Sequence, residues 1–197
     1  MSSINSLGLN EQELLFLSHS FETSPHSNYY LELKGQPDLV KVIDILEWVL
    51  NKFGYSSEQA HSRLSRIHFH TLMFHLIAEV SSEKWSNTIA SLVSGSKVAA
   101  KQACGFEFHD DTLDHVLENK LEFRIAHSLD EQKNILFKIE ENNFVKFNLS
   151  NPVIEFKRGN IKFYFTPVLV CKDPLKTVGL GDAISSSGII YADYKHD

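Results

Sequence analysis

Hydrophobic and polar positions in the first part of the chain follow two helical patterns separated by a polar segment. Residues 4–9 predict the end of a short strand, and Asn10 is placed to cap a helix over 11–18 whose first turn carries acidic side chains. Residues 19–36, rich in Ser, His and Asn, predict a loop. A second helix, predicted over 37–53, places the following apolar residues on one face: Leu39, Val42, Ile43, Leu46, Val49 and Leu50.

The pattern then changes to a long apolar run. Residues 67–80 combine β-branched and aromatic side chains, which predicts one buried strand, although the second half of the run also fits a helix. Residues 83–103 predict a helix. After Cys104, short apolar runs alternate with turn residues, which predicts strands at 121–126, 135–139, 144–149, 153–157 and 161–170. The last two runs predict a hairpin.

The end of the chain predicts a loop over 172–180 and a Ser- and Gly-rich helix over 182–191. No linker divides the predicted elements, so we expect a single domain over residues 1–197 and no second one.

Composition narrows the classes of protein that fit this pattern. The chain carries 19 Lys and Arg against 25 Asp and Glu, a net charge of −6, which argues against a general nucleic-acid binder. It contains no apolar run of the length of a transmembrane helix, and its first residues show neither the basic region nor the apolar core of a signal peptide. The sequence patterns of a P-loop, a Gly-x-Ser-x-Gly nucleophile elbow and a His-Glu-x-x-His zinc site are absent from it.

The sharpest motif is the run Thr-Val-Gly-Leu-Gly-Asp-Ala at residues 177–183. Its glycines allow backbone conformations that other residues rarely adopt, and the N–H groups of 179–182 can then converge on an anion at the positive end of a helix. Asp182 would place a carboxylate beside that anion, where it could accept a proton from an attacking hydroxyl group. The motif therefore suits phosphoryl transfer, and the alternative is a helix that Asp182 simply caps.

Asn10 and Glu13 form a second candidate site. They lie three residues apart and share one helical face, where they could orient Mg²⁺ through its water ligands. The same spacing is that of a capping box, in which each of the two side chains accepts a bond from the backbone amide of the other residue. The sequence fits both interpretations.

Three histidines, His68, His70 and His75, fall within the long apolar run. On a single strand His68 and His70 would point to one face and His75 to the other, so they would not converge as zinc ligands. One side of this run could stack on a nucleotide base or hydrogen-bond with it. Otherwise the three are hydrogen-bonded histidines beside a buried strand.

Residues 177–185 resemble the C-terminal signature of the ribokinase-like sugar kinases. Together with the segments 6–17, 66–71 and 165–174, they make nearly the whole chain resemble the C-terminal part of the animal ADP-dependent glucokinases. The resemblance implies an α/β fold, namely the C-terminal portion of a ribokinase-like large domain in three layers, with a hairpin-rich C-terminal segment and without the lid domain. It also implies a glycolytic kinase that transfers phosphate from ADP to the 6-hydroxyl of glucose and releases AMP.

The resemblance assigns roles by position. Asp182 matches the catalytic base, and the turn that holds the transferring phosphate matches Gly179, Leu180 and Gly181. Asn10 and Glu13 match an Asn-x-x-Glu motif that supports Mg²⁺, with Asp182 as a further metal ligand. The strand at 66–71 and the residues Val170 and Cys171 lie where that family builds its nucleotide pocket, and His70, His75 and Val170 are the candidate nucleotide-binding residues.

We therefore expect ADP or AMP, glucose and Mg²⁺ as ligands, no nucleic acid, and a monomer. Members of that family are much longer, and the half that carries the lid, most sugar-binding residues and a His-x-Glu magnesium motif has no counterpart in these residues. The chain is thus expected to be inactive alone. The alternative is a non-catalytic nucleotide-binding module or an inactive truncated isoform.

Cys104 and Cys171 are the two cysteines of the chain. Animal members of the resembled family carry a secretory signal, so the parent protein is expected in the endoplasmic reticulum lumen or outside the cell, where disulfides persist. We therefore expect the two cysteines to pair and to clamp one wall of the adenine pocket. Two buried free thiols are the alternative.

Overall fold

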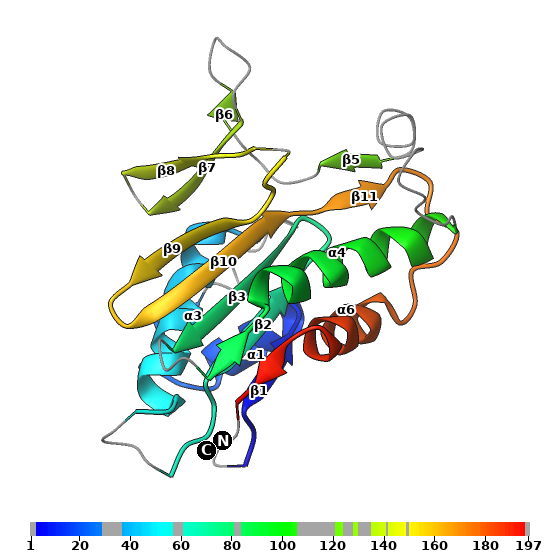
Figure 1. The fold of residues 1–197 in the computed structure, drawn as a ribbon. Coiled ribbons are helices and arrows are strands. Elements are labelled where there is room, and N and C mark those ends of the chain that lie inside the picture. Colours follow the sequence, from blue (N-terminus) through cyan, green and yellow to red (C-terminus); the bar gives the residue numbers. More distant parts are fainter. Residues whose placement is uncertain are drawn as a thin grey trace.

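The computed structural model describes residues 3–28, 37–56, 61–80, 84–105, 121–123, 128–129, 135–140, 142–148 and 150–195. Within these residues the fold is built on a five-stranded sheet of order β1-β2-β3-β10-β9 (Figure 1). Its strands, in that order, are Ser6–Leu9, Arg66–His70, Phe74–Val80, Ile161–Pro167 and Ile154–Arg158. β1 and β2 run parallel, and the other neighbouring pairs are antiparallel.

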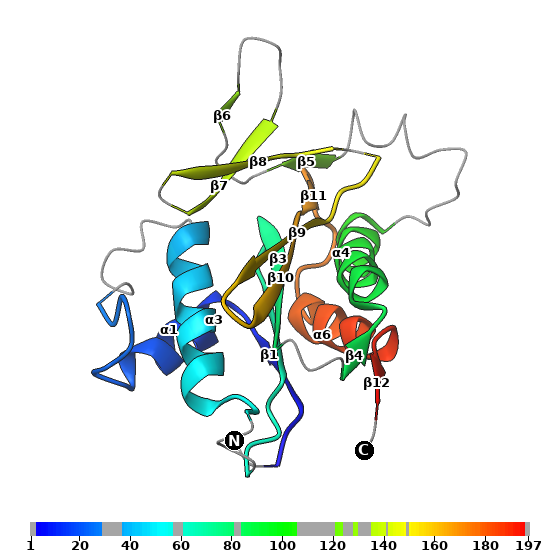
Figure 2. The same ribbon diagram turned by 60° about the vertical axis from the view of Figure 1, so that its left-hand side comes forward.

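Helices cover both faces of this sheet. Figure 2 shows α1 (Glu11–His19) and α3 (Leu39–Phe53) on one side and α4 (Thr88–Cys104) and α6 (Leu180–Ile190) on the other. The arrangement is therefore a three-layer α/β fold within the described residues. None of the helices described is both long and apolar enough to span a membrane.

Three smaller sheets complete the described part of the chain. In each of them the neighbouring strands are antiparallel. Their strands are β11 (Leu169–Cys171) with β5 (Leu121–Phe123), β12 (Asp193–Tyr194) with β4 (Trp85–Ser86), and β6 (Ser128–Leu129), β7 (Ile135–Glu140) and β8 (Asn143–Lys146).

The two faces of the central sheet differ in chemistry because alternate residues of each strand point to opposite sides. Toward α3, Ile67 and Phe69 of β2 belong to the main apolar core, together with apolar residues of α3, β3 and β10. Toward α4 and α6, β2 instead presents Arg66, His68 and His70, all of them buried. The face toward α3 thus carries the main core, and the face toward α4 and α6 carries buried polar groups beside a smaller apolar cluster of Ile77, Leu92, Val153 and Tyr164.

Several predicted elements are confirmed. The strand at 6–9, the helix after Asn10, the helix that ends at Phe53 and the hairpin of the last two runs are all present. Asp38 caps α3 by accepting bonds from the N–H groups of Val40 and Lys41. The segment 29–36 of the predicted loop lies outside the described residues, as do parts of the runs at 121–126 and 144–149.

The prediction of one strand over 67–80 is wrong. The chain turns back after His70, and β2 and β3 pair as an antiparallel hairpin. The side chain of Thr71 closes this turn, since its hydroxyl oxygen accepts bonds from the N–H groups of Met73 and Phe74 at 2.9 and 3.1 Å. A threonine side chain here replaces the glycine or asparagine that usually marks a turn, which is why the apolar run hides it.

Two predicted boundaries also change. The helix predicted over 83–103 begins at Thr88, because Trp85 and Ser86 form β4. The strand predicted over 161–170 is divided into β10 and β11 at Val168, whose N–H donates to the carbonyl of Met73.

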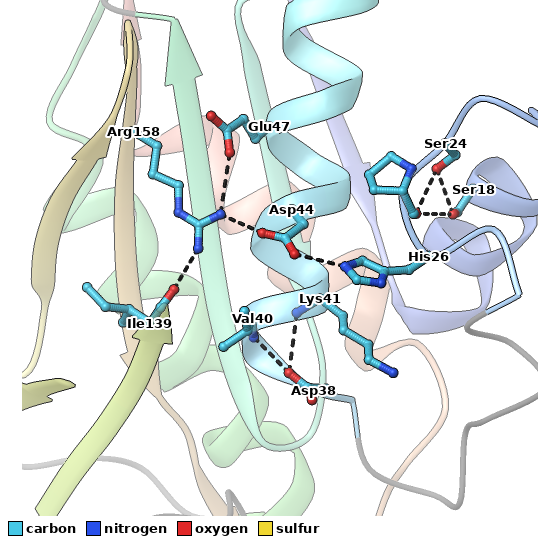
Figure 3. A network of polar contacts seen from close by, with 11 residues as sticks. Ser18, Ser24, His26, Asp38, Val40, Lys41, Asp44, Glu47, Ile139 and Arg158 are labelled. Atoms are coloured by element: carbon cyan, nitrogen blue, oxygen red, sulfur yellow. Dashed lines mark hydrogen bonds and ion pairs between the residues drawn. The ribbon is translucent and has the colours of Figure 1, made fainter. Parts of the chain in front are cut away.

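Arg158 at the end of β9 ties the sheet to α3 and β7 (Figure 3). Its guanidinium donates to Asp44 at 2.5 Å and to the carbonyl of Ile139 at 2.8 Å, and it contacts Glu47 at 3.4 Å. His26, from the segment after α1, contacts the other carboxylate oxygen of Asp44 at 2.8 Å. This network joins β9, β7 and α3 on the side of the sheet opposite to α6 (Figure 2).

Candidate active site

The glycine turn opens helix α6. Gly179 is the N-cap residue and has a φ of 77°, in the left-handed region that favours glycine. A glycine cannot cap the helix with a side chain, so the N–H groups of the first turn keep their capacity to bind an anion. Asp182 lies in this first turn with its side chain exposed. The turn thus combines amide donors with a carboxylate, as phosphoryl transfer requires.

The carboxylates of Glu13 and Asp182 both act electrostatically on the ring of His70. Burial lowers the pKa of His70, and the two carboxylates partly oppose this by raising it. β1 and β2 are parallel, so α1, which carries Glu13, starts at the edge of the sheet where β2 ends at His70. Gly181 lies against the ring of His70, which places the first turn of α6, and with it Asp182, at the same edge.

Asn10 and Glu13 form a capping box. The N–H of Glu13 donates to the Asn10 amide oxygen at 2.9 Å, and the N–H of Asn10 donates to a Glu13 carboxylate oxygen at 2.8 Å. The capping interpretation of this spacing is therefore the one that the described contacts support directly, and the metal interpretation stays a prediction.

The donor set of this region fits a magnesium ion that arrives with a nucleotide. No group of three His, Cys, Asp or Glu side chains in the described part of the chain is arranged to hold a metal ion by itself. Mg²⁺, however, is usually held by one or two carboxylates together with phosphate oxygens and waters. Glu13 and Asp182, which both act on His70, provide carboxylates of that kind.

An apolar pocket lies beside the glycine turn. It is formed by the Thr71 turn, α4, β11 and the start of α6, and its lining residues are Thr71, Leu72, Ala99, Ala100, Ala103, Val168, Val170, Cys171, Pro174, Thr177, Leu180 and Ile184. Val170, expected in the nucleotide pocket, is among them. The flat aromatic face of a base such as adenine suits this apolar lining, and the adjoining turn suits the phosphates of a nucleotide.

His70 and His75 do not line this pocket. His75 is fully buried and is not among the lining residues, and its role in nucleotide binding stays a prediction. His70, with an exposed fraction of 6%, faces the glycine turn instead. The pocket residue Thr71 ends the segment 66–71, which the resemblance places at the nucleotide pocket. Leu72, which belongs to the turn within the apolar run, and the small residues of α4 were not predicted. The helical spacing of Ala99, Ala100 and Ala103 was the available signal for the latter.

The three histidines lie together. His70 and His75 are direct partners in the β2–β3 hairpin, and the ring centroids of the three are 5.7 to 6.1 Å apart. Their expected separation onto two faces was wrong because it assumed one strand. Neither ring nitrogen of His68 or His75 has a hydrogen-bond partner among the residues described, so the expectation of hydrogen-bonded histidines is also wrong for these two.

Because His68 and His75 are buried, we expect the folded chain to lose stability as the pH falls. Burial lowers the pKa of His68 well below 6.5 and that of His75 to about 3, so both are neutral in the folded chain. The unfolded chain binds protons near its ordinary histidine pKa, and the free energy of unfolding is therefore highest above about pH 7 and falls as the pH drops. From about pH 7.5 to about pH 5.5 we expect a loss of about 1.4 kcal/mol for each of the two.

Urea unfolding at several pH values across this range measures the loss. A free energy of unfolding that stays constant between these pH values would contradict the presence of neutral, buried histidines in the folded chain.

Cys104 and Cys171 are joined in a disulfide, with their Cα atoms 5.5 Å apart. The bond links the last residue of α4 to the last residue of β11. Cys171 lines the pocket, and both cysteines pack with Ala100, Ala103 and Leu180. The disulfide therefore fixes two walls of the pocket to each other.

Comparison with known proteins identifies the family of this site. Residues 1–191 match the conserved region of the ADP-specific phosphofructokinases and glucokinases. The chain belongs to this family. It is 44% identical over 191 residues to the ADP-dependent glucokinase of Bos taurus and 38% identical over 196 residues to the probable ADP-dependent glucokinase of Caenorhabditis elegans.

These matches cover 97% of this chain but 35% and 36% of the two relatives, so the chain spans about a third of their length. Among solved structures, a hypothetical ADP-dependent phosphofructokinase from Pyrococcus horikoshii is similar with a TM-score of 0.58 at 16% identity, covering 96% of this chain and 36% of that one. This likeness shows that the α/β fold described above is that of the ADP-specific phosphofructokinase/glucokinase family.

Proposed function

We propose that this chain supplies the catalytic base, the phosphate-binding turn and the adenine pocket of an ADP-dependent glucokinase. One observation carries the proposal: the glycine turn, Asp182 and the apolar pocket adjoin one another at the edge where β1 and β2 end. The two relatives that cover nearly all of this chain bear the name ADP-dependent glucokinase or probable ADP-dependent glucokinase, which supports glucose as the acceptor.

In the proposed reaction Asp182 accepts the proton of the 6-hydroxyl of glucose while that oxygen attacks the β-phosphorus of ADP. The bond between the β-phosphorus and the bridging oxygen breaks, and AMP leaves as glucose 6-phosphate forms. The N–H groups of Leu180, Gly181 and Asp182 stabilise the negative charge on the transferred group. The adenine lies against Val170 and Leu72 in the apolar pocket.

Magnesium belongs to this proposal as the cofactor. Bound with the nucleotide, it would neutralise charge on the phosphoryl group. Glu13 and Asp182 would hold it with their carboxylates, and Asn10 would keep Glu13 in place through the capping box.

We also propose that the parent protein is a monomer of the endoplasmic reticulum lumen or the extracellular space. The Cys104–Cys171 disulfide supports an oxidising compartment, because structural disulfides persist there and are rare in the cytosol.

Calorimetry with Mg-ADP and with AMP tests the first part of the proposal, and a coupled assay for glucose 6-phosphate tests the second. The 197-residue chain should bind both nucleotides without measurable turnover, because it spans about a third of the relatives' length and the family resemblance places most sugar-binding residues outside it. The complete reading frame that contains this chain should turn over glucose. Binding without turnover by that complete protein would support a non-catalytic nucleotide-binding module instead, and no nucleotide binding by either would reject both functions.

Replacing Glu13 by Gln separates the metal role from the capping role. Glutamine keeps the capping bond, so the free energy of unfolding should change by less than about 0.5 kcal/mol. Loss of the carboxylate should raise the Mg²⁺ concentration required for ADP binding and turnover several-fold.

The matched control is Glu11→Gln, which removes a partly exposed carboxylate from the same helical turn. It should leave the Mg²⁺ requirement unchanged. Equal Mg²⁺ requirements in the Glu13 variant and the wild type would leave Glu13 with its capping role alone.

A further inference from the structure

Helix α6 carries both the amide donors and the carboxylate of the candidate active site, so its placement on the sheet decides where both lie. β2 turns three alternate side chains toward it, namely Arg66, His68 and His70. The face of α6 that packs on β2 carries two glycines, Gly181 and Gly188. They are seven residues, and hence two helical turns, apart.

Each glycine lies against one histidine ring. A Cβ atom at Gly181 would lie 3.1 Å from Cε1 of His70, and one at Gly188 would lie 2.6 Å from Nδ1 of His68. The second distance is shorter than any that a real side chain adopts, so only glycine lets the helix approach this closely. Two ring contacts two turns apart fix both the height of the helix above the sheet and its position along its own axis.

Hydrogen bonds hold the C-terminal end of α6 in place. The Gly188 carbonyl accepts bonds from the Ser91 hydroxyl and from the Arg66 guanidinium, which also donates to Ser91 at 2.7 Å. The ring of His68 is 1% exposed, and its nitrogens have no hydrogen-bond partner among the residues described. The ring therefore serves the helix as a packing surface rather than as a hydrogen-bond partner.

We propose that His68 and His70 are positioning residues, whose rings under Gly188 and Gly181 hold the first turn of α6, and with it Asp182, at the place where phosphate is transferred. The inference rests on the proposed function for the reaction that it serves. We call the two ring contacts, His68 with Gly188 and His70 with Gly181, the histidine seat. Its effect on the position of α6 can be tested without measuring turnover.

The test adds a methyl group at the far end of the helix, in Gly188→Ala. This change is two turns away from Asp182, yet contact with His68 should displace the whole helix. We expect the backbone amide signals of Gly181 and Asp182 in a ¹⁵N NMR spectrum to shift, and the Kd for Mg-ADP to rise about 10-fold or more. Ser186→Ala, which adds no group toward the sheet because residue 186 is exposed on α6, should change neither.

The double variant Gly188→Ala/His68→Asn makes room for the methyl group and should return both the signals and the Kd toward wild-type values. His68→Asn alone, which loosens the seat without adding bulk, should shift the Asp182 signal as well. Should Gly188→Ala not fold, these two variants decide the question. Lower stability with unchanged Asp182 signals and unchanged Kd would show a purely structural role and overturn the proposal.

Failure of the proposed function would give a different experimental result from failure of the positioning role. A wild-type chain that binds neither Mg-ADP nor AMP would reject the nucleotide site, while the amide signals of Gly181 and Asp182 would still decide whether the histidine seat positions the turn.

Discussion

Asp182→Asn in the complete protein should lower kcat by about 10²–10⁴-fold, the typical contribution of a general base. Asparagine keeps the size and shape of the side chain but cannot accept the proton of the attacking hydroxyl. The first-turn amides of α6 and the apolar pocket are untouched by this change, so at saturating Mg²⁺ the Kd for ADP should stay within a few-fold of the wild-type value. A coupled glucose 6-phosphate assay and calorimetry measure the two quantities.

A matched control is Glu155→Gln. Glu155 is an exposed carboxylate on β9, at the opposite edge of the sheet from β1, and its replacement should leave kcat unchanged. Near-normal turnover by the Asp182 variant would exclude Asp182 as the base. Loss of ADP binding together with turnover would instead indicate that Asp182 acts mainly in holding the nucleotide.

Removing the disulfide should have the largest effect on stability. Cys104 and Cys171 are 67 residues apart, and closing a loop of this length stabilises the folded chain by about 4 kcal/mol in the chain-entropy model. The double variant Cys104→Ser/Cys171→Ser should lose about that much free energy of unfolding. Because Cys171 lines the pocket and the bond ties β11 to α4, AMP binding should weaken at the same time.

Urea unfolding and calorimetry of the double variant measure both effects, with the reduced wild-type chain as the comparison that leaves the sequence unchanged. Reduction and substitution should give the same loss. Two titratable thiols in unreduced protein from an oxidising compartment would show that the bond does not form in solution.

Local chemistry explains what could be predicted about the elements near the site. Asn10 and Glu13 cap α1 through bonds between residues three apart, and the spacing of apolar residues in α3 follows from one helix alone. Gly179 marks the turn before a helix for a similarly local reason, and it has a positive φ, whereas Gly181 lies within α6, which begins at Leu180. In each case the physical cause lies within a few residues of the signal.

The hairpin between β2 and β3 shows where such arguments fail. The Thr71 hydroxyl forms the turn by accepting hydrogen bonds from two backbone N–H groups. Threonine can do this but is also common in strands, so the residue type alone does not predict a turn. Missing this turn assigned His75 to the wrong face, because reversing a strand changes which side chains are neighbours. It also concealed that Leu72 lines the pocket.

By itself, the sequence determined the caps, the helical periods, the glycine turn and the carboxylate beside it, since each depends on interactions between residues close in the chain. Only the tertiary structure decided that His68 and His70 lie under α6 and that Val170, Ala100 and Leu72 share one pocket. It also buried Arg66 against Glu79, 3.7 Å away. The partners in these contacts come from different strands and helices, and their meeting depends on strand pairing and helix packing, which no local pattern encodes.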